Sequence, residues 1–217
     1  MQTIALSEAV AMIPDGASLM VGGFMAVGTP EPLMDELVRQ GKRRLTVIAN
    51  DTAMPGAGIG KLVSAGLVAR VIASHIGLNP ETQKGMLTGK IDVELVPQGT
   101  LIERIRAGGF GLGGVLTPTG VGTLAAEGKT TVDVDGKTFL LEKPIRADFA
   151  LLKAHAADYL GNLTYALTAR NFNPVIAMAA EKVIVYAENI VPVGVIPPDQ
   201  VVTPAPLVDY LVAQGGS

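Results

Sequence analysis

The residues best suited to chemistry stand in a glycine-rich loop at positions 22–28. Gly22 and Gly23 follow a short apolar run at residues 19–21, which predicts a buried strand, and glycine can enter positive φ without a Cβ clash. Such a loop points backbone N–H groups outward and suits an anion or a developing oxyanion. The loop matches neither the Walker pattern nor Gly-x-Gly-x-x-Gly. A second interpretation stays open, in which the two glycines merely let a helix pack closely against a strand.

Two amide side chains occupy comparable positions after other predicted strands. Asn50 and Gln98 each follow an apolar run of strand length. Because ligands of a parallel sheet bind beyond the carboxyl ends of its strands, we expect both amides to lie near residues 22–28, where each can donate and accept a hydrogen bond. By themselves they could equally be loop amides that bond to nearby backbone, and Asp51 is interpreted as structural.

The titratable side chains form no recognisable catalytic or metal-binding group. His75 and His155 lack a Ser or Cys nucleophile motif and a cluster of further zinc ligands, so both are interpreted as polar residues with satisfied hydrogen bonds. Arg104 and Arg106, on the helix predicted after Gln98, lie either on a solvated face or near enough to the site to hold a phosphate. No triad or carboxylate pair supports a self-sufficient hydrolase or lyase.

The elements that would position these residues alternate between strands and helices. A helix over residues 7–13, capped by Ser7, precedes the glycine loop, and a second helix follows it, capped by Thr29 and ended by Gly41. Further strands are predicted at residues 45–49, 68–74, 91–96, 149–154 and 183–186. Further helices are predicted at residues 79–88, 100–107 and 173–180, and from Pro206 onward. This alternation predicts an α/β fold with a mostly parallel central sheet and helices on both faces.

One segment departs from that alternation. Asp135 and Gly136 stand between two strand-like runs and predict a small β-hairpin insert near residues 129–142. With 217 residues, the chain is expected to form a single domain over residues 1–217. The prolines between residues 192 and 206 predict an extended tail before the last short helix.

Composition narrows the range of partners. A net charge of -3 gives no basic footprint for nucleic acid. The absence of cysteine and of a secretory signal at the N-terminus predicts a cytoplasmic protein. Residues 107–126 carry no charge and are long enough to span a bilayer, but their glycines and Pro118 oppose a continuous helix. We interpret this stretch as a protein-covered glycine loop outside any membrane, and its apolar character suggests a partner surface.

The glycine loop belongs to a longer pattern. Residues 15–30 contain Asp-Gly, two free positions, three apolar residues, Gly-Gly-Phe, three free positions, Gly, one free position and Pro. These residues meet every fixed position of the type I coenzyme A transferase signature. The chain resembles the α subunits of that family from about residue 5 to about residue 210, most closely those of bacterial acetate or acetoacetate CoA-transferases. Further matching stretches are residues 48–51, 73–77, 96–101, 116–123 and 169–174.

This resemblance implies an acyl transfer whose parts are divided between two chains. Coenzyme A is implied as a substrate, with no permanently bound cofactor and no metal. The implied nucleophile is a glutamate in a Ser-Glu-Asn-Gly motif of a β subunit, in an α2β2 assembly. Gln98 and Asn50 are implied to support catalysis beside that glutamate. The implied CoA-binding residues are Gly22, Gly23, Phe24, Met25, Ala26, Val27 and Gly28. Glu188 lacks the flanking serine and glycine of the motif and is interpreted as a surface residue after a strand.

Two questions stay open at this level. Because the chain has no recognisable nucleophile, it could instead be a non-catalytic anion-binding or regulatory domain related to sugar-phosphate isomerases. The acyl group is also open, since acetate, butyrate, acetoacetate, succinate and 3-oxoadipate differ by small groups worth about 1–3 kcal/mol in a pocket.

Overall fold

A computed structural model describes residues 1–212 of the chain, and its centre is a parallel sheet. The strand order is β1 (Gln2–Ile4), β12 (Tyr210–Val212), β11 (Ala180–Val191), β9 (Ala147–Asp158), β2 (Ser18–Val21), β3 (Leu45–Asp51), β4 (Val68–His75) and β5 (Asp92–Leu95). Neighbours in this order pair in parallel, and β10 (Leu163–Thr164) adds an antiparallel pair to β9. The predicted α/β class with a mostly parallel sheet is confirmed.

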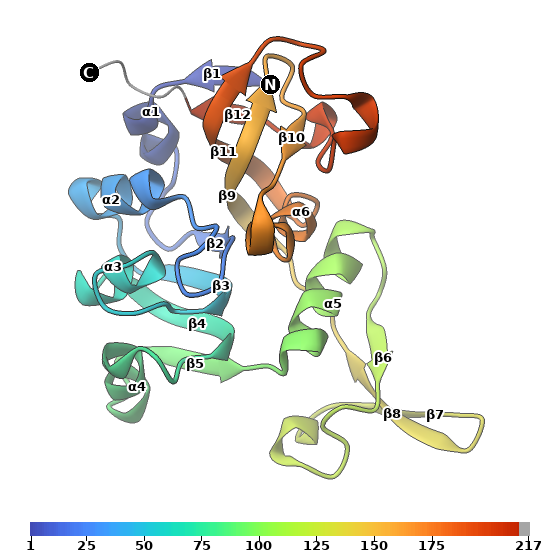
Figure 1. Cartoon of the computed structure of the whole chain (residues 1–217). Helices are drawn as coiled ribbons and strands as arrows, with labels where there is room; N and C mark the ends of the chain where they lie inside the picture. Colours follow the sequence, from blue (N-terminus) through green and yellow to red (C-terminus); the bar gives the residue numbers. More distant parts are fainter. Residues whose placement is uncertain (213–217) are drawn as a thin grey trace.

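Helices cover both faces of this sheet (Figure 1). One face carries α1 (Leu6–Ala11), α2 (Glu31–Gln40), α3 (Ile59–Ser64) and α4 (Pro80–Leu87), and the other carries α5 (Gln98–Gly109) and α6 (Asn173–Ile176). Alternate residues of a strand enter different cores, because successive side chains point to opposite faces. Leu19 of β2 packs in the core under α1, α2 and α3, whereas Met20 packs in the core under α5 and α6. This double burial explains why the strands are nearly continuous apolar runs.

Some predicted helix boundaries are confirmed and others are wrong. Asn79 caps α4 by accepting hydrogen bonds from the N–H groups of Glu81 and Thr82, as its position before a proline predicts, and Gly41 ends α2 with φ 65°. Ser7 does not cap α1, since Ala5 takes that position.

The second helix also begins differently from the prediction. Thr29 is not its cap, because the Thr29 hydroxyl donates to the Gly22 carbonyl and Pro30 stands at the N-cap. Likewise α5 begins at Gln98 and not at Thr100.

The C-terminal third differs most from the prediction. The helix predicted over residues 173–180 stops at Ile176, because the chain must enter β11 at Ala180. The tail contains the 3-10 turns η3 (Pro198–Gln200) and η4 (Ala205–Leu207), and the helix predicted from Pro206 is replaced by η4 and then β12. β12 has only three residues, and its place between β1 and β11 comes from long-range pairing, which no local pattern reveals.

A small antiparallel arm stands apart from the main body (Figure 1). It contains β6 (Val115–Thr117), β7 (Thr131–Val134) and β8 (Lys137–Glu142) in the order β6-β8-β7. The predicted hairpin is confirmed, and β6 adds a third strand. Residues 107–126 form the end of α5, β6 and the 3-10 turn η1 (Leu124–Ala126). This stretch is therefore no simple loop, and it is not covered by this chain, since Phe110 is 61% exposed and Leu124 is 83% exposed.

Within residues 1–212, no helix combines the length and the apolar character that crossing a membrane requires.

Candidate active site

Three segments meet at the carboxyl edge of the sheet. Gln98, at the start of α5, donates through Nε2 to Asn50 Oδ1 at 3.2 Å. Asn50, near the end of β3, donates through Nδ2 to the Gly23 carbonyl at 2.9 Å. Asn50 is buried, whereas Gln98 is exposed, so the chain of hydrogen bonds runs from the glycine loop out to the surface. The structure therefore brings together the residues that the sequence placed at one edge.

The glycine pair is required by the packing around it. A Cβ at Gly22 would collide with the Oδ1 of Asn173, and Gly23 has φ 103°, where a Cβ would also lie 2.7 Å from the Thr29 nitrogen. The two interpretations of the glycine pair, close packing and an outward-facing loop, are therefore compatible. The loop leaves the sheet edge at a point where its backbone lies close to neighbouring residues, and only glycine fits there.

The tip of the loop is a tight turn. The N–H of Phe24 donates to the carbonyl of Val27 at 3.0 Å, and the N–H of Val27 donates back at 2.9 Å. Met25 and Ala26, the two central residues, have φ values of 49° and 68°, in the left-handed region that side chains rarely adopt. The side chains of Phe24, Met25 and Val27 are all exposed. The loop thus presents an apolar tip near the side-chain amides of Asn50 and Gln98.

Two buried side chains that the sequence analysis did not place at the site, Asp51 and Asn173, are hydrogen-bonded to this loop. Asn173 donates through Nδ2 to the Gly28 carbonyl and to the Ala169 carbonyl, both at 3.0 Å. Asp51 accepts the N–H of Met25, at 3.2 Å from each carboxylate oxygen. The Asn-Pro pair at 173–174 signals only a helix start, and Asp51 follows Asn50 as any Asx-turn residue would. Their roles depend on tertiary contacts that a sequence pattern does not encode.

The two histidines differ in their surroundings. His155 Nδ1 lies 3.0 Å from Glu188 Oε2, so its expected polar partner is present. His75 ends β4 beside Asp51 and is exposed, and no hydrogen bond of its side chain is formed among residues 1–212. The residues described here therefore supply no partner for the His75 ring, which is open to solvent.

The arginines of α5 are engaged within the chain. Arg104 donates to Glu94 Oε1 and to the Lys143 carbonyl, both at 2.9 Å, and so ties α5 to β5 and to the segment after β8. Its side chain is largely buried, so of the two positions considered from the sequence the solvated face is wrong for Arg104. Arg106 is half-buried and pairs with Glu103. Both arginines therefore have carboxylate partners within this chain.

Glu188 lies within β11 and not after a strand, which corrects the sequence interpretation. It pairs with Lys153 Nζ at 2.8 Å as well as with His155. The hydrogen bond from Lys153, followed by that from His155, holds the pKa of Glu188 below its ordinary value. Glu188 lines a cavity of about 120 Å³ together with Val27 and Gly28, so this ion-paired cluster borders the far side of the glycine loop.

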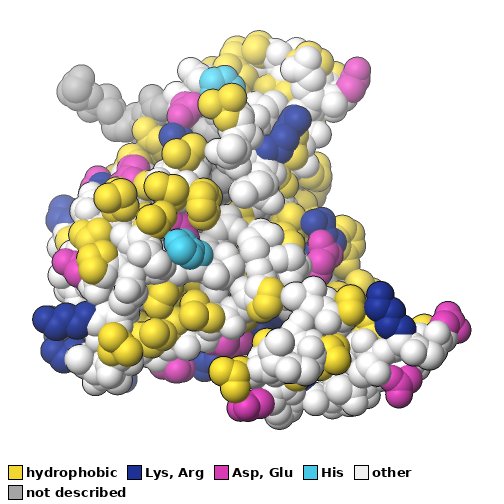
Figure 2. Space-filling view, turned by 60° about the horizontal axis from the view of Figure 1, so that its bottom comes forward, with side chains coloured by type: hydrophobic (Ala, Val, Ile, Leu, Met, Phe, Trp, Pro, Cys, Tyr) yellow, Lys and Arg dark blue, Asp and Glu magenta, His cyan; other side chains and the backbone are white. Residues whose placement is uncertain are grey.

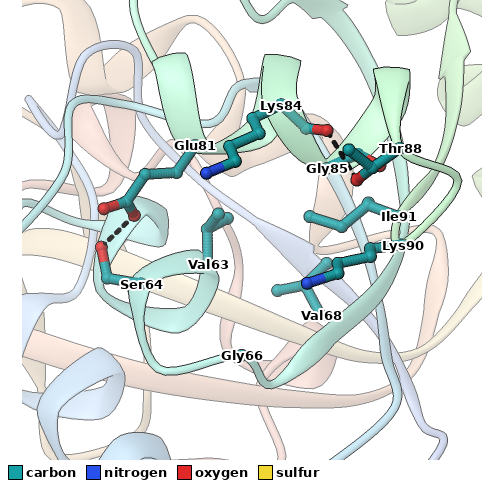
Figure 3. A pocket seen from close by; sticks show the side chains of 10 residues that line it. All are labelled: Val63, Ser64, Gly66, Val68, Glu81, Lys84, Gly85, Thr88, Lys90 and Ile91. Atoms are coloured by element: carbon teal, nitrogen blue, oxygen red, sulfur yellow. Dashed lines mark hydrogen bonds between the residues drawn. The ribbon is translucent and has the colours of Figure 1, made fainter.

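A larger cavity, of about 500 Å³, lies elsewhere (Figure 3). Its ten lining residues are Val63, Ser64, Gly66, Val68, Glu81, Lys84, Gly85, Thr88, Lys90 and Ile91. Val68 begins β4 and Ile91 precedes β5, so this cavity is at the amino ends of the strands, opposite the glycine loop. This cavity is the larger of the two, but it contains none of the residues singled out for chemistry. We therefore place the candidate site at the carboxyl edge of the sheet.

Apolar side chains are also exposed over a wide area. In Figure 2 hydrophobic side chains gather in patches over both the body and the arm, and most charged side chains lie toward the rim. Exposed apolar residues of the arm and its approach include Phe110, Leu112, Leu116 and Leu124. Exposed apolar patches that cover a wide area are typical of surfaces that meet another macromolecule.

A parallel sheet covered on both faces, with a glycine loop at its carboxyl edge, is an arrangement in which α/β proteins commonly bind ligands at the strand ends. Within residues 1–212, no group of three His, Cys, Asp or Glu side chains could hold a metal ion. The family model for coenzyme A transferase matches residues 3–214. The chain belongs to the coenzyme A transferase family.

Individual relatives agree with this assignment. The chain is 56% identical over 209 residues to the acetate CoA-transferase subunit alpha of Escherichia coli K12, covering 96% of this chain and 95% of that protein. It is 50% identical to the acetoacetyl-CoA:acetate/butyrate CoA transferase alpha subunit of Clostridium acetobutylicum, covering 92% of each. A solved acyl-CoA transferase of E. coli O157:H7, in a thioester complex with CoA, matches 98% of this chain with a TM-score of 0.84 and 26% identity. The chain spans about half of that solved chain, 47% of its length.

Proposed function

We propose that this chain is the α subunit of a heteromeric CoA-transferase that moves CoA between a short-chain acyl-CoA and a short-chain or 3-oxo acid. The observation that carries the proposal is the chain of hydrogen bonds from Gln98 through Asn50 to Gly23, at the edge where a parallel sheet binds ligands. Membership of the family and the two relatives named as alpha subunits support it.

The reaction that follows is a ping-pong transfer. A glutamate of the β subunit attacks the thioester carbonyl and forms an acyl-glutamyl anhydride with release of CoA thiolate. The thiolate then attacks the glutamyl carbonyl, releases the first carboxylate and leaves a glutamyl-CoA thioester. An acceptor carboxylate reverses both steps. No oxidant or reductant is consumed, and covalent catalysis of this kind divides one difficult step into easier ones.

This chain supplies positioning and hydrogen-bond donors. Each attack produces a tetrahedral oxyanion, and one pre-positioned donor can stabilise such a transition state by about 3–4 kcal/mol. Gln98 is exposed, and its amide is oriented by Asn50, which suits an interaction with the partner's glutamate. Residues 22–28 shape the binding site for acyl-CoA. Coenzyme A enters as a substrate, and the proposal requires no resident cofactor.

The proposed assembly contains two α and two β chains in the cytoplasm. The exposed apolar residues of the arm and of the end of α5 are candidates for contact with a β subunit. The choice among acetate, butyrate, acetoacetate, succinate and 3-oxoadipate as acyl group depends on a pocket that the partner shares.

The first experiment measures CoA transfer from acetyl-CoA to acetoacetate with this chain alone and with a co-expressed β-type chain. Activity only with the partner, and borohydride trapping on a partner glutamate, would support the proposal. Transfer by this chain alone would return Glu188 as a candidate nucleophile. Tight anion binding without any transfer would favour the non-catalytic alternative.

Within the active complex, Gln98→Ala is expected to lower turnover more than tenfold, because an oriented amide is lost at the reacting carboxylate. Gln40→Ala is the matched control. Gln40 is the last residue of α2, and its amide likewise donates a hydrogen bond, to the Ser7 carbonyl. Size-exclusion chromatography checks that both variants assemble. Unchanged turnover in Gln98→Ala would remove Gln98 from the mechanism.

A further inference from the structure

The turn at the tip of the glycine loop adopts a conformation that its own residues disfavour. Met25 and Ala26 have φ values of 49° and 68°, although neither is Gly, Asn or Asp. Turns of this kind with positive φ at both central positions normally use Asn-Gly or Asp-Gly. A side chain in the left-handed region is strained and persists only where the surroundings enforce it.

Asp51 is hydrogen-bonded to this turn through the Met25 N–H. The residue is only 3% exposed, and its carboxylate accepts the Met25 N–H with both oxygens at 3.2 Å and the Ala53 N–H at 3.0 Å. Ala53 is itself left-handed, with φ 52°. Six residues other than glycine have positive φ in the described chain, and two of them, Met25 and Ala53, donate their N–H groups to this one carboxylate. A buried carboxylate that accepts backbone N–H groups makes strong, charge-assisted hydrogen bonds.

Burial of the ionised Asp51 carboxylate lowers the stability of the fold, so stability does not account for a carboxylate at this position. Desolvation raises the pKa of Asp51, and the hydrogen bonds from Met25 and Ala53 and the nearby His75 offset only part of this effect. An uncharged side chain would avoid that cost at the end of a buried strand. Strained residues and costly buried charges concentrate where function requires a fixed backbone.

We propose that Asp51 is a positioning residue of the transfer reaction, which fixes the turn at residues 24–27 and thereby the surface that meets acyl-CoA. Asp51 does not touch substrate, because it lies beneath the loop. It acts through the Met25 N–H, so that Phe24, Met25 and Val27 are held outward. This inference rests on the proposed function.

The test compares Asp51→Asn with Asp158→Asn in the assembled complex. Asp158 is the matched control, because it is an equally buried carboxylate at the end of β9 that accepts the N–H groups of Leu160, Gly161 and Asn162. Asp51→Asn replaces one acceptor oxygen by an NH2 group, and we expect at least a tenfold rise in KM for acetyl-CoA or an equal fall in kcat. Asp158→Asn is expected to lower Tm while leaving both kinetic constants within twofold.

Glycine substitution at the turn should partly rescue the variant. Ala26→Gly removes the backbone strain at position 26, so the turn depends less on the Asp51 hydrogen bonds. We therefore expect kcat/KM of the double variant Asp51→Asn/Ala26→Gly to be at least threefold higher than that of Asp51→Asn. Kinetic constants of Asp51→Asn that match those of Asp158→Asn would overturn the inference. Absence of transfer even in the wild-type complex would instead contradict the proposed function.

A measurement on the wild-type complex covers the case in which Asp51→Asn does not assemble. Hydrogen exchange at the Met25 N–H is expected to be at least 100-fold slower than in an unstructured peptide, although the Met25 side chain is 42% exposed. Exchange at the unprotected rate would show that the carboxylate does not hold the turn, and would overturn the inference.

Discussion

Two tight turns in this chain share a backbone geometry but differ in what stabilises them. The hairpin of the arm turns at Asp135 and Gly136, with φ values of 50° and 74°, and the glycine loop turns at Met25 and Ala26, with φ values of 49° and 68°. The first turn uses residues that favour this geometry by themselves. The second is held by a buried carboxylate, Asp51.

The two turns also differ in their surroundings, and this difference fits the role proposed for the glycine loop. The hairpin tip is exposed, and its side-chain bond between Thr138 and Asp133 is local. The glycine-loop tip lies beside Asn50 and Gln98 and carries large apolar side chains that a ligand or partner can contact. Placing Met and Ala in such a turn is unfavourable, and the tertiary contacts compensate for it. Three predictions sharpen this comparison.

The largest effect is expected for Gly23→Ala. The new Cβ would combine positive φ with close contact to Thr29, so we expect a loss of at least about 3 kcal/mol in unfolding free energy. Displacement of the loop should lower the turnover of the complex about 100-fold. Urea unfolding and the transfer assay measure the two effects.

Gly136→Ala in the hairpin is the matched control for this variant. It has the same requirement for positive φ, but a Cβ there meets no atom within 4 Å. We expect a loss of about 1 kcal/mol and unchanged turnover. Equal effects of the two glycine variants would contradict the distinction between the turns.

A smaller effect of opposite sign is expected for Ala26→Gly in the wild-type background. Glycine relieves the strain of the left-handed conformation in the folded state. This gain is larger than the loss from the greater conformational entropy of glycine in the unfolded state, so the unfolding free energy should rise by about 0.5–1 kcal/mol. A change of this size raises Tm by about 1–4 °C in a chain of this length, as differential scanning calorimetry would measure. Ala65→Gly is the control, since Ala65 has φ -79° and gains no relief. A loss of stability in both variants would show that Ala26 is not strained.

The smallest effect concerns pH and the two buried carboxylates Asp51 and Asp158. Burial would raise the pKa of Asp158, but the hydrogen bonds from Asn162, Leu160 and Gly161 outweigh it and hold the pKa below its ordinary value. Its stabilising contribution is therefore present above the unfolded pKa, about 3.9, and is lost as the pH falls through the folded value. The pKa of Asp51 is raised in the folded state, chiefly by burial. Asp51 therefore favours the folded state most at a pH below its unfolded pKa, and this contribution to stability is lost as the pH rises through the folded pKa.

Urea unfolding at pH 7, 5 and 3.5 tests this expectation. The stability difference between wild type and Asp158→Asn should shrink on acidification, whereas the difference between wild type and Asp51→Asn should shift in the other direction. A difference for Asp158→Asn that is constant from pH 7 to pH 3.5 would show that its hydrogen bonds do not depend on ionisation.

Much of the fold could be predicted because its signals are local. Strands buried on both faces appear as apolar runs, so β3 and β4 were found near their true bounds. The three-residue strands β1 and β12 were not found, because their pairing at the edge of the sheet depends on residues some 200 positions apart. The same limit applies to the site. The glycine signature and the two amides stand out in the sequence, whereas Asp51 and Asn173 act through contacts that only the folded chain creates.

By itself, the sequence determined the α/β class, the glycine loop at residues 22–28 and the arm hairpin, because periodicity and turn chemistry are properties of short segments. The tertiary structure alone decided that Thr29 bonds to Gly22, that Arg104 is held by Glu94, and that Asp51 supports a strained turn. These outcomes depend on which buried polar groups meet across the fold. Each group removed from water must find a partner, and that partner is set by the packing of distant segments.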